Sequence, residues 1–68
     1  MSRYVVRNPA GFYLVGHCQF VPDVRLAQSF PTAEEARRYK RACRLTPGQE
    51  KEFKVCEVTD GGLVLPAE

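Results

Sequence analysis

Residues 30–44 read FPTAEEARRYKRACR, and this stretch is expected to form the helix around which the other elements are arranged. Thr32 and Glu35 have capping-box spacing, in which the threonine side chain accepts from the glutamate N–H and the glutamate side chain returns to the threonine N–H. Glu34 and Glu35 lie where the helix dipole favours negative charge. Proline and glycine at 47 and 48 predict the end of this helix, since both residues commonly follow a last helical turn.

One side of this predicted helix is apolar and made of small side chains. At about 100° per residue, Ala36, Tyr39 and Cys43 share a stripe that Ala33 and Ala42 flank. Since Tyr39 is the only large member, the stripe predicts a helix that lies close against a sheet. Most of the core volume must then come from the strands.

The opposite side of the predicted helix is strongly basic. Five of the ten Lys and Arg residues lie there, namely Arg37, Arg38, Lys40, Arg41 and Arg44. Such a face neutralises phosphates or meets an acidic protein surface, although a solvated helix face has a similar composition. The formal net charge of +2 is too small to imply nucleic-acid binding by itself. These five residues are the candidate partner-binding residues.

The segment before the helix is expected to form strands. Residues 3–7 alternate apolar side chains in a period of two, which predicts a first strand. Residues 8–11, NPAG, are typical of a reverse turn. Residues 12–20 are predicted to form one second strand with a bulge at Gly16, and residues 24–29 a short third strand after a reversal at Pro22.

The segment after the helix predicts two further strands. Residues 49–52 are expected to be a polar connector, residues 53–58 a fourth strand, and residues 63–65 a short last strand closed by Pro66. The TDGG sequence at 59–62 is a strong hairpin signal. The chain is therefore predicted to be a single α+β domain over 1–68. It has two layers, an antiparallel sheet of three to five strands with one helix, in the order ββ(β)αβ(β).

Composition is typical of a small globular domain. The 68 residues are 44% hydrophobic and 26% charged, and no apolar run approaches the roughly 20 residues that a membrane span requires. The first residues resemble a strand rather than a signal peptide. Three cysteines form an odd number at wide spacing, so reduced thiols and a cytoplasmic location are expected.

Neither a metal site nor an active site is expected. His17, Cys18, Cys43 and Cys56 contain no C-x₂-C pair of the kind that structural zinc sites use, so no metal or cofactor is predicted. A cysteine nucleophile paired with His17 is the enzymatic alternative. However, Cys18 adjoins His17 on a predicted strand and points to the other face. A chain of this length also offers little room for a substrate pocket, so the protein is not expected to be an enzyme.

A sheet with one helix leaves its second face open. Tyr13, and Tyr4 or Phe53 depending on register, are candidates for that face. An exposed aromatic face usually marks a partner or a dimer interface. Tyr13 therefore joins the candidate partner-binding residues, and this face is the candidate surface for a homodimer.

Four segments carry a resemblance to a known group of proteins: 4–7 (YVVR), 11–14 (GFYL), 27–36 (AQSFPTAEEA) and 54–58 (KVCEV). Together they resemble small accessory proteins of bacteriophages and mobile elements, a group that includes many anti-CRISPR proteins. The resemblance implies a non-catalytic inhibitor that binds and blocks a host protein or ribonucleoprotein complex. Many such inhibitors are acidic mimics of nucleic acid, whereas this chain is basic, which favours an acidic protein surface or a site near guide RNA.

The chain is also similar to the three-stranded arm-binding domains of phage integrases, in which a sheet enters the DNA groove. This similarity implies that Arg3, Arg7 and Arg25 lie on the exposed sheet face. Direct nucleic-acid binding through the basic helix face, together with an exposed aromatic such as Tyr13, is the alternative function.

Overall fold

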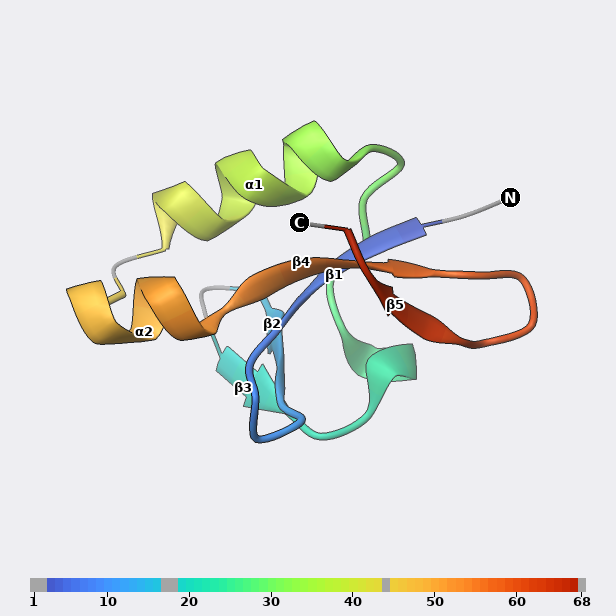
Figure 1. Ribbon diagram of the computed structural model, residues 1–68, viewed down its shortest axis with the longest axis horizontal. Helices are drawn as coiled ribbons and strands as arrows, with labels where there is room; N and C mark the ends of the chain where they lie inside the picture. The colour runs from blue at the N-terminus through green and yellow to red at the C-terminus, as the bar shows by residue number, and fades with distance from the viewer. Residues whose placement is uncertain (1–2, 17–18, 44, 68) are drawn as a thin grey trace.

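The computed structural model describes residues 3–16, 19–43 and 45–67. These form one antiparallel sheet in the order β3-β2-β1-β4-β5, with α1 packed across one face (Figure 1). The predicted fold class, a two-layer α+β domain, is confirmed. The elements in chain order are β1 (Arg3–Arg7), β2 (Tyr13–Val15), β3 (Gln19–Val21), the 3₁₀ helix η1 (Val24–Leu26), α1 (Ala33–Ala42), α2 (Pro47–Glu52), β4 (Lys54–Val58) and β5 (Val64–Pro66).

Strand β1 is the centre of the sheet and matches its predicted range. It pairs with β2 on one side and with β4 on the other. Val5 lies opposite Cys56, and Val6 lies opposite Val55. Since neighbouring side chains in a strand point to opposite faces, these two pairs begin two separate apolar clusters. Val5 and Val6 are both fully buried, so both faces of the sheet are covered at β1.

The turn after β1 is confirmed at residues 8–11. Gly11 has a φ of +91°, which a glycine adopts without the steric cost that a side chain would add. The Gly11 N–H donates to the carbonyl oxygen of Asn8 at 3.1 Å. The Asn8 Oδ1 atom accepts from the Phe12 N–H at 2.8 Å. The asparagine therefore closes the turn with both its backbone and its side chain.

The prediction of one strand over 12–20 is wrong. The segment instead contains β2 and β3, which pair with each other so that Leu14 lies opposite Phe20. Gly16 ends β2 with a φ of +58°, so it belongs to a turn rather than to a bulge. Apolar residues on both faces of this segment predict a long central strand. In the structure these residues belong instead to two short strands.

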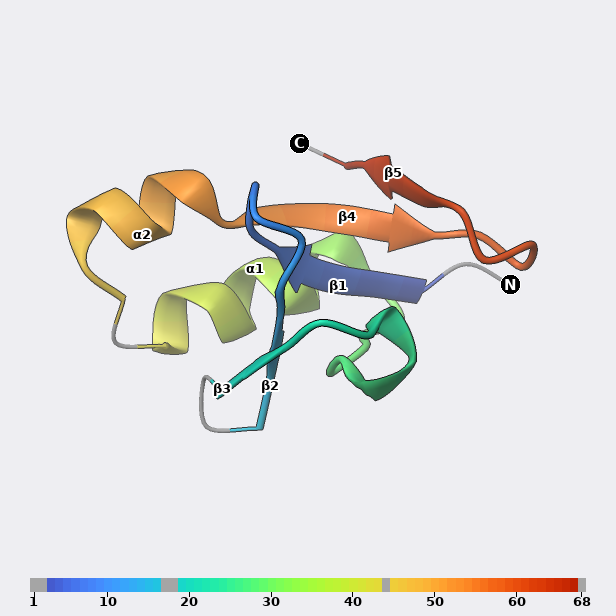
Figure 2. The ribbon, with the colours of Figure 1, turned by 90° about the horizontal axis from the view of Figure 1, so that it is seen from below.

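The prediction of a third strand over 24–29 is also wrong. Asp23 caps η1 by accepting from the Arg25 N–H at 2.9 Å, which fixes a 3₁₀ turn where extended backbone was expected. Val24 and Ala27 pack against the sheet cluster of Val5, Tyr13, Cys56 and Val58. Residues 22–29 are called the covering segment below, because Val24 and Ala27 pack on the sheet face opposite α1. Figure 2 views that face and shows the segment crossing β2 and running alongside β1.

Helix α1 begins as predicted. Thr32 Oγ1 accepts from the Glu35 N–H at 3.2 Å, the one half of the predicted capping box that the described residues show. Ala36 is fully buried, and the Phe30 and Tyr39 rings lie 5.0 Å apart beside it. The Tyr39 hydroxyl donates to the carbonyl oxygen of Gly16 at 3.0 Å, which joins α1 to the end of β2.

Residues predicted as a stop and a polar connector form a second helix, α2. Thr46 makes a complete capping box with Gln49: Thr46 Oγ1 accepts from the Gln49 N–H at 3.2 Å, and Gln49 Oε1 accepts from the Thr46 N–H at 3.1 Å. Pro47 occupies the first turn, where its missing N–H costs no hydrogen bond. The same proline that follows one helix therefore starts the next.

The rest of the chain follows the prediction closely. Phe53, just before β4, is 1% exposed and joins Val6, Leu14, Ala36 and Val55 in the cluster under α1. The Gly62 N–H donates to the Thr59 carbonyl oxygen at 2.9 Å in the predicted hairpin. The last strand is displaced by one residue from its predicted range, because β5 spans Val64–Pro66 at the edge of the sheet.

Candidate partner-binding site

The basic residues of α1 differ in what they contact. Arg38 donates to Glu34 at 3.1 Å, and both side chains are about 70% exposed, so this pair contributes little to stability. Arg37 and Arg41 are exposed and Lys40 is half-buried. Among the described residues, none of the side chains of Arg37, Lys40 and Arg41 makes an ion pair. Arg44, the fifth candidate, lies outside the described residues.

The three unpaired cations surround one hollow. Arg37, Lys40 and Arg41 line a space of about 180 Å³ together with Glu50 of α2. They have spacings of i, i+3 and i+4, which bring side chains onto one face of a helix. Figure 1 shows α2 beside the C-terminal half of α1, which explains how Glu50 reaches this group. We call these four residues the basic hollow.

Glu50 is a residue that sequence reasoning missed. The capping-box spacing of Thr46 and Gln49 and the proline at the first helical position both predict the start of α2. The interpretation of residues 45–48 as a helix stop instead places Glu50 in a connector. The complete cap matters for the site, because a helix of six residues depends on its cap to hold Glu50 in place.

Tyr13 does not belong to the site. Its side chain is 7% exposed, in the cluster beneath the covering segment, so the prediction that it lies on an open sheet face is wrong. The Arg7 guanidinium carbon lies 5.9 Å from the centre of the Tyr13 ring and covers it further. The sheet face proposed for a homodimer is therefore largely occupied by the chain itself.

The arginines expected to enter a DNA groove lie apart from any bare sheet face. Arg25 is in η1, where its guanidinium donates to the Asp23 carboxylate at 2.9 Å. These hydrogen bonds hold the pKa of Asp23 below its ordinary value. Arg3 is half-buried, and Arg7 lies over Tyr13. The covering segment lies over the surface that a groove-binding sheet must leave free.

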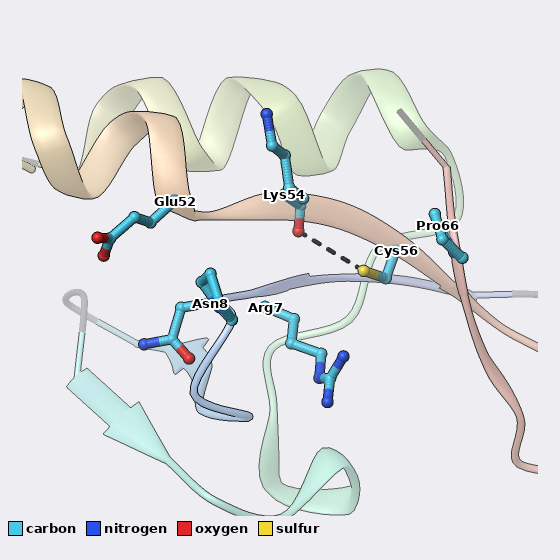
Figure 3. Close-up of a pocket in the computed structure, with 7 residues that line it drawn as sticks. Arg7, Asn8, Glu52, Lys54, Cys56 and Pro66 are labelled. Carbon is cyan, nitrogen blue, oxygen red and sulfur yellow. Dashed lines mark hydrogen bonds between the residues drawn. The ribbon is translucent and has the colours of Figure 1, made fainter.

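A second hollow, of about 190 Å³, lies between the β1–β2 turn and β4 (Figure 3). Cys56, a cysteine outside any disulfide, lines it. The Cys56 thiol donates to the carbonyl oxygen of Lys54 at 3.8 Å. Glu52 opposes the charges of Arg7 and Lys54 here, so this hollow has a weaker charge preference than the basic hollow.

The cysteines differ from one another in chemical state. Cys43 takes part in a disulfide, so the expectation of reduced thiols is wrong for this residue. Cys56 is a reduced, buried thiol, as expected. His17 and Cys18, the other members of the weighed metal and catalytic sets, lie outside the described residues.

The rest of the described chain adds no metal site. No cluster of three or more His, Cys, Asp or Glu side chains within residues 3–16, 19–43 and 45–67 has the arrangement to hold a metal ion. In the same ranges, neither length nor hydropathy allows any helix to span a bilayer.

No family model, curated protein or solved structure matches this chain. The function must therefore be argued from the basic hollow itself.

Proposed function

We propose that this protein is a non-catalytic binding protein whose basic hollow docks on an acidic surface of a host protein or ribonucleoprotein complex and blocks it. The observation that carries the proposal is the charge arrangement on α1. Arg38 is paired with Glu34, while Arg37, Lys40 and Arg41 have no ionic partner among the described residues and surround one hollow. Arginine and lysine groups without an ionic partner form charge-assisted hydrogen bonds when an anion of a partner protein reaches them.

The blocking role is supported by the resemblance to phage and mobile-element accessory proteins. The size of the chain is compatible with such a role, because a 68-residue domain has little room for a substrate pocket. Both helices that line the basic hollow are held by side-chain hydrogen bonds, since Tyr39 ties α1 to the end of β2 and Thr46 caps α2. Groups that are held in place before binding lose less entropy on binding.

Affinity capture from a bacterial lysate tests the proposal. The tagged protein is compared with the double variant Arg37→Glu/Arg41→Glu, whose substitutions are exposed and leave the apolar face of α1 unchanged. We expect the parent to retain a defined partner and the double variant to lose it. Equal capture by both proteins, with unchanged circular dichroism spectra, contradicts the proposal.

Nucleic-acid binding through the same residues is the second candidate, because the same cations neutralise phosphodiesters. A salt titration with random-sequence duplex DNA and RNA separates the two functions. Three cations predict a slope of log K against log salt of about −2.7 for B-DNA if each contacts one phosphate. Micromolar binding with this slope favours nucleic acid, and absence of binding at low salt removes that candidate.

A further inference from the structure

We infer that the basic hollow holds a phosphomonoester group, and that its source is a phosphorylated serine or threonine of the partner protein. This inference rests on the proposed function and names the chemistry that the site recognises. An acidic partner offers either carboxylates or phosphates. The composition of the hollow distinguishes between these two anions.

The first step is the charge balance. Three cations, Arg37, Lys40 and Arg41, face one carboxylate, Glu50, so the hollow carries two net positive charges. A carboxylate or a phosphodiester brings a single negative charge. A phosphorylated side chain carries about −1.5 to −2 at pH 7 and three strong acceptor oxygens. The phosphomonoester therefore matches the hollow in charge.

The second step is the donor geometry. Arg37 and Arg41 lie one helical turn apart with Lys40 beside them, so donors approach the hollow from two arginines and one lysine. Guanidinium groups bind phosphate oxygens in a bidentate manner, and lysine adds a point charge. A tetrahedral group with three free oxygens uses all three cations, whereas a planar carboxylate has two oxygens to offer.

The third step identifies the source of the phosphate. Glu50 lies at the α2 edge of the hollow. A nucleic-acid strand that crosses the hollow places successive phosphates near this carboxylate, which repels them. A single phosphate on an otherwise uncharged peptide avoids most of that repulsion. Glu50 therefore favours a phosphorylated protein over a polyanionic strand.

Amide NMR with small probes tests the site before any partner is known. Inorganic phosphate, dimethyl phosphate and acetate are titrated into the full chain at constant ionic strength. We expect saturable shifts in residues 37–41 and 47–52, with affinity for phosphate about tenfold above that for the two monoanions. Equal affinity for all three anions, or shifts that never saturate, overturns the inference.

Matched variants then assign the residues. Arg37→Gln/Lys40→Gln is expected to weaken phosphate binding about tenfold or more. Arg38→Gln, on the same helix but paired with Glu34, is expected to leave it within about twofold. Glu50→Gln removes the opposing charge and is expected to strengthen binding about threefold. Equal losses in Arg37→Gln/Lys40→Gln and Arg38→Gln overturn the assignment to the hollow.

The source is tested with two larger probes. A pentapeptide with one phosphoserine between alanines, blocked at both ends, is compared with a 5′-phosphorylated single-stranded RNA of ten nucleotides. We expect the peptide to bind and its unphosphorylated form not to bind. Tighter binding of the RNA overturns the protein source. If no phosphate probe binds while Arg37→Glu/Arg41→Glu still abolishes partner capture, this inference fails and the proposed function stands.

Discussion

The two faces of the sheet are covered in different ways. Helix α1 covers one face and packs on a cluster that includes Phe53, whereas the other face lies under the covering segment, which contributes Val24 and Ala27. Both faces are closed to solvent at β1, where Val5 and Val6 are fully buried. The comparison shows that a regular helix and a short irregular segment can bury the same strand, and that only the helix leaves its outer side free for a charged surface.

The largest loss of stability should follow a substitution at Phe53, on the α1 face of the sheet. Its side chain is 1% exposed and its ring lies 5.4 Å from that of Phe20. Phe53→Ala is expected to lower the free energy of unfolding by about 3–5 kcal/mol, because it removes a large buried side chain and leaves a cavity. Urea unfolding followed by circular dichroism measures the loss. A loss below about 1 kcal/mol contradicts the α1 face as the main source of core volume.

The covering segment should give a smaller effect with a local signature. Ala27→Asp places a charge at a position that is 9% exposed, and we expect a loss of about 2 kcal/mol. Because Ala27 and Cys56 belong to the same cluster, opening of the covering segment should increase the exposure of the Cys56 thiol. The labelling rate of Cys56 with a thiol reagent should rise in this variant. An unchanged rate means that the segment does not shield the sheet.

The two helix caps allow a finer comparison. Thr46→Ala and Thr32→Ala each remove a side-chain acceptor from a helix N-terminus, at a cost of about 1 kcal/mol. Because α2 is short and its cap is reciprocal, Thr46→Ala should also broaden the amide signals of residues 47–52. Thr32→Ala should leave them sharp. Thermal unfolding and amide NMR measure the two effects, and identical spectra would contradict a special role for the α2 cap.

The smallest expected effect is on the pKa of Asp23, whose side chain is 35% exposed. Its pKa is lowered because Arg25 donates hydrogen bonds to its carboxylate and places a positive charge near it. A lowered folded-state pKa adds stability that is present above the unfolded-state pKa and is lost as the pH falls through the folded-state value. In Arg25→Gln the pKa of Asp23 should rise toward its ordinary value. A carboxyl-carbon NMR titration of both proteins provides the measurement, and an unchanged pKa contradicts the pairing.

The contrast between the two faces also explains what the sequence can predict. Helix α1 was predictable because its cap, its apolar stripe and its charges repeat over ten residues. Strands β1 and β4 were predictable because they alternate and are bounded by turn residues. The covering segment was not, because a 3₁₀ turn set by one Asp23 side chain has no period to detect.

The candidate site was predictable only in part. The basic face of α1 followed from helical spacing. Its residues differ, however, in their ionic contacts: Arg38 pairs with Glu34, whereas the other described members lie around a hollow that depends on the position of α2. Glu50 reaches the hollow only because α2 follows α1 closely. Tyr13 was misplaced because the burial of a sheet face depends on which segment folds over it, and neither composition nor alternation specifies that segment.

The most direct test of the account compares partner capture by two double charge reversals. Arg37→Glu/Arg41→Glu alters the basic hollow, and Arg3→Glu/Arg25→Glu makes the same change of net charge at positions outside that hollow. The account predicts that the first variant loses the partner and the second retains it. Retention by the first variant with loss by the second would contradict the account and place the binding surface elsewhere on the molecule.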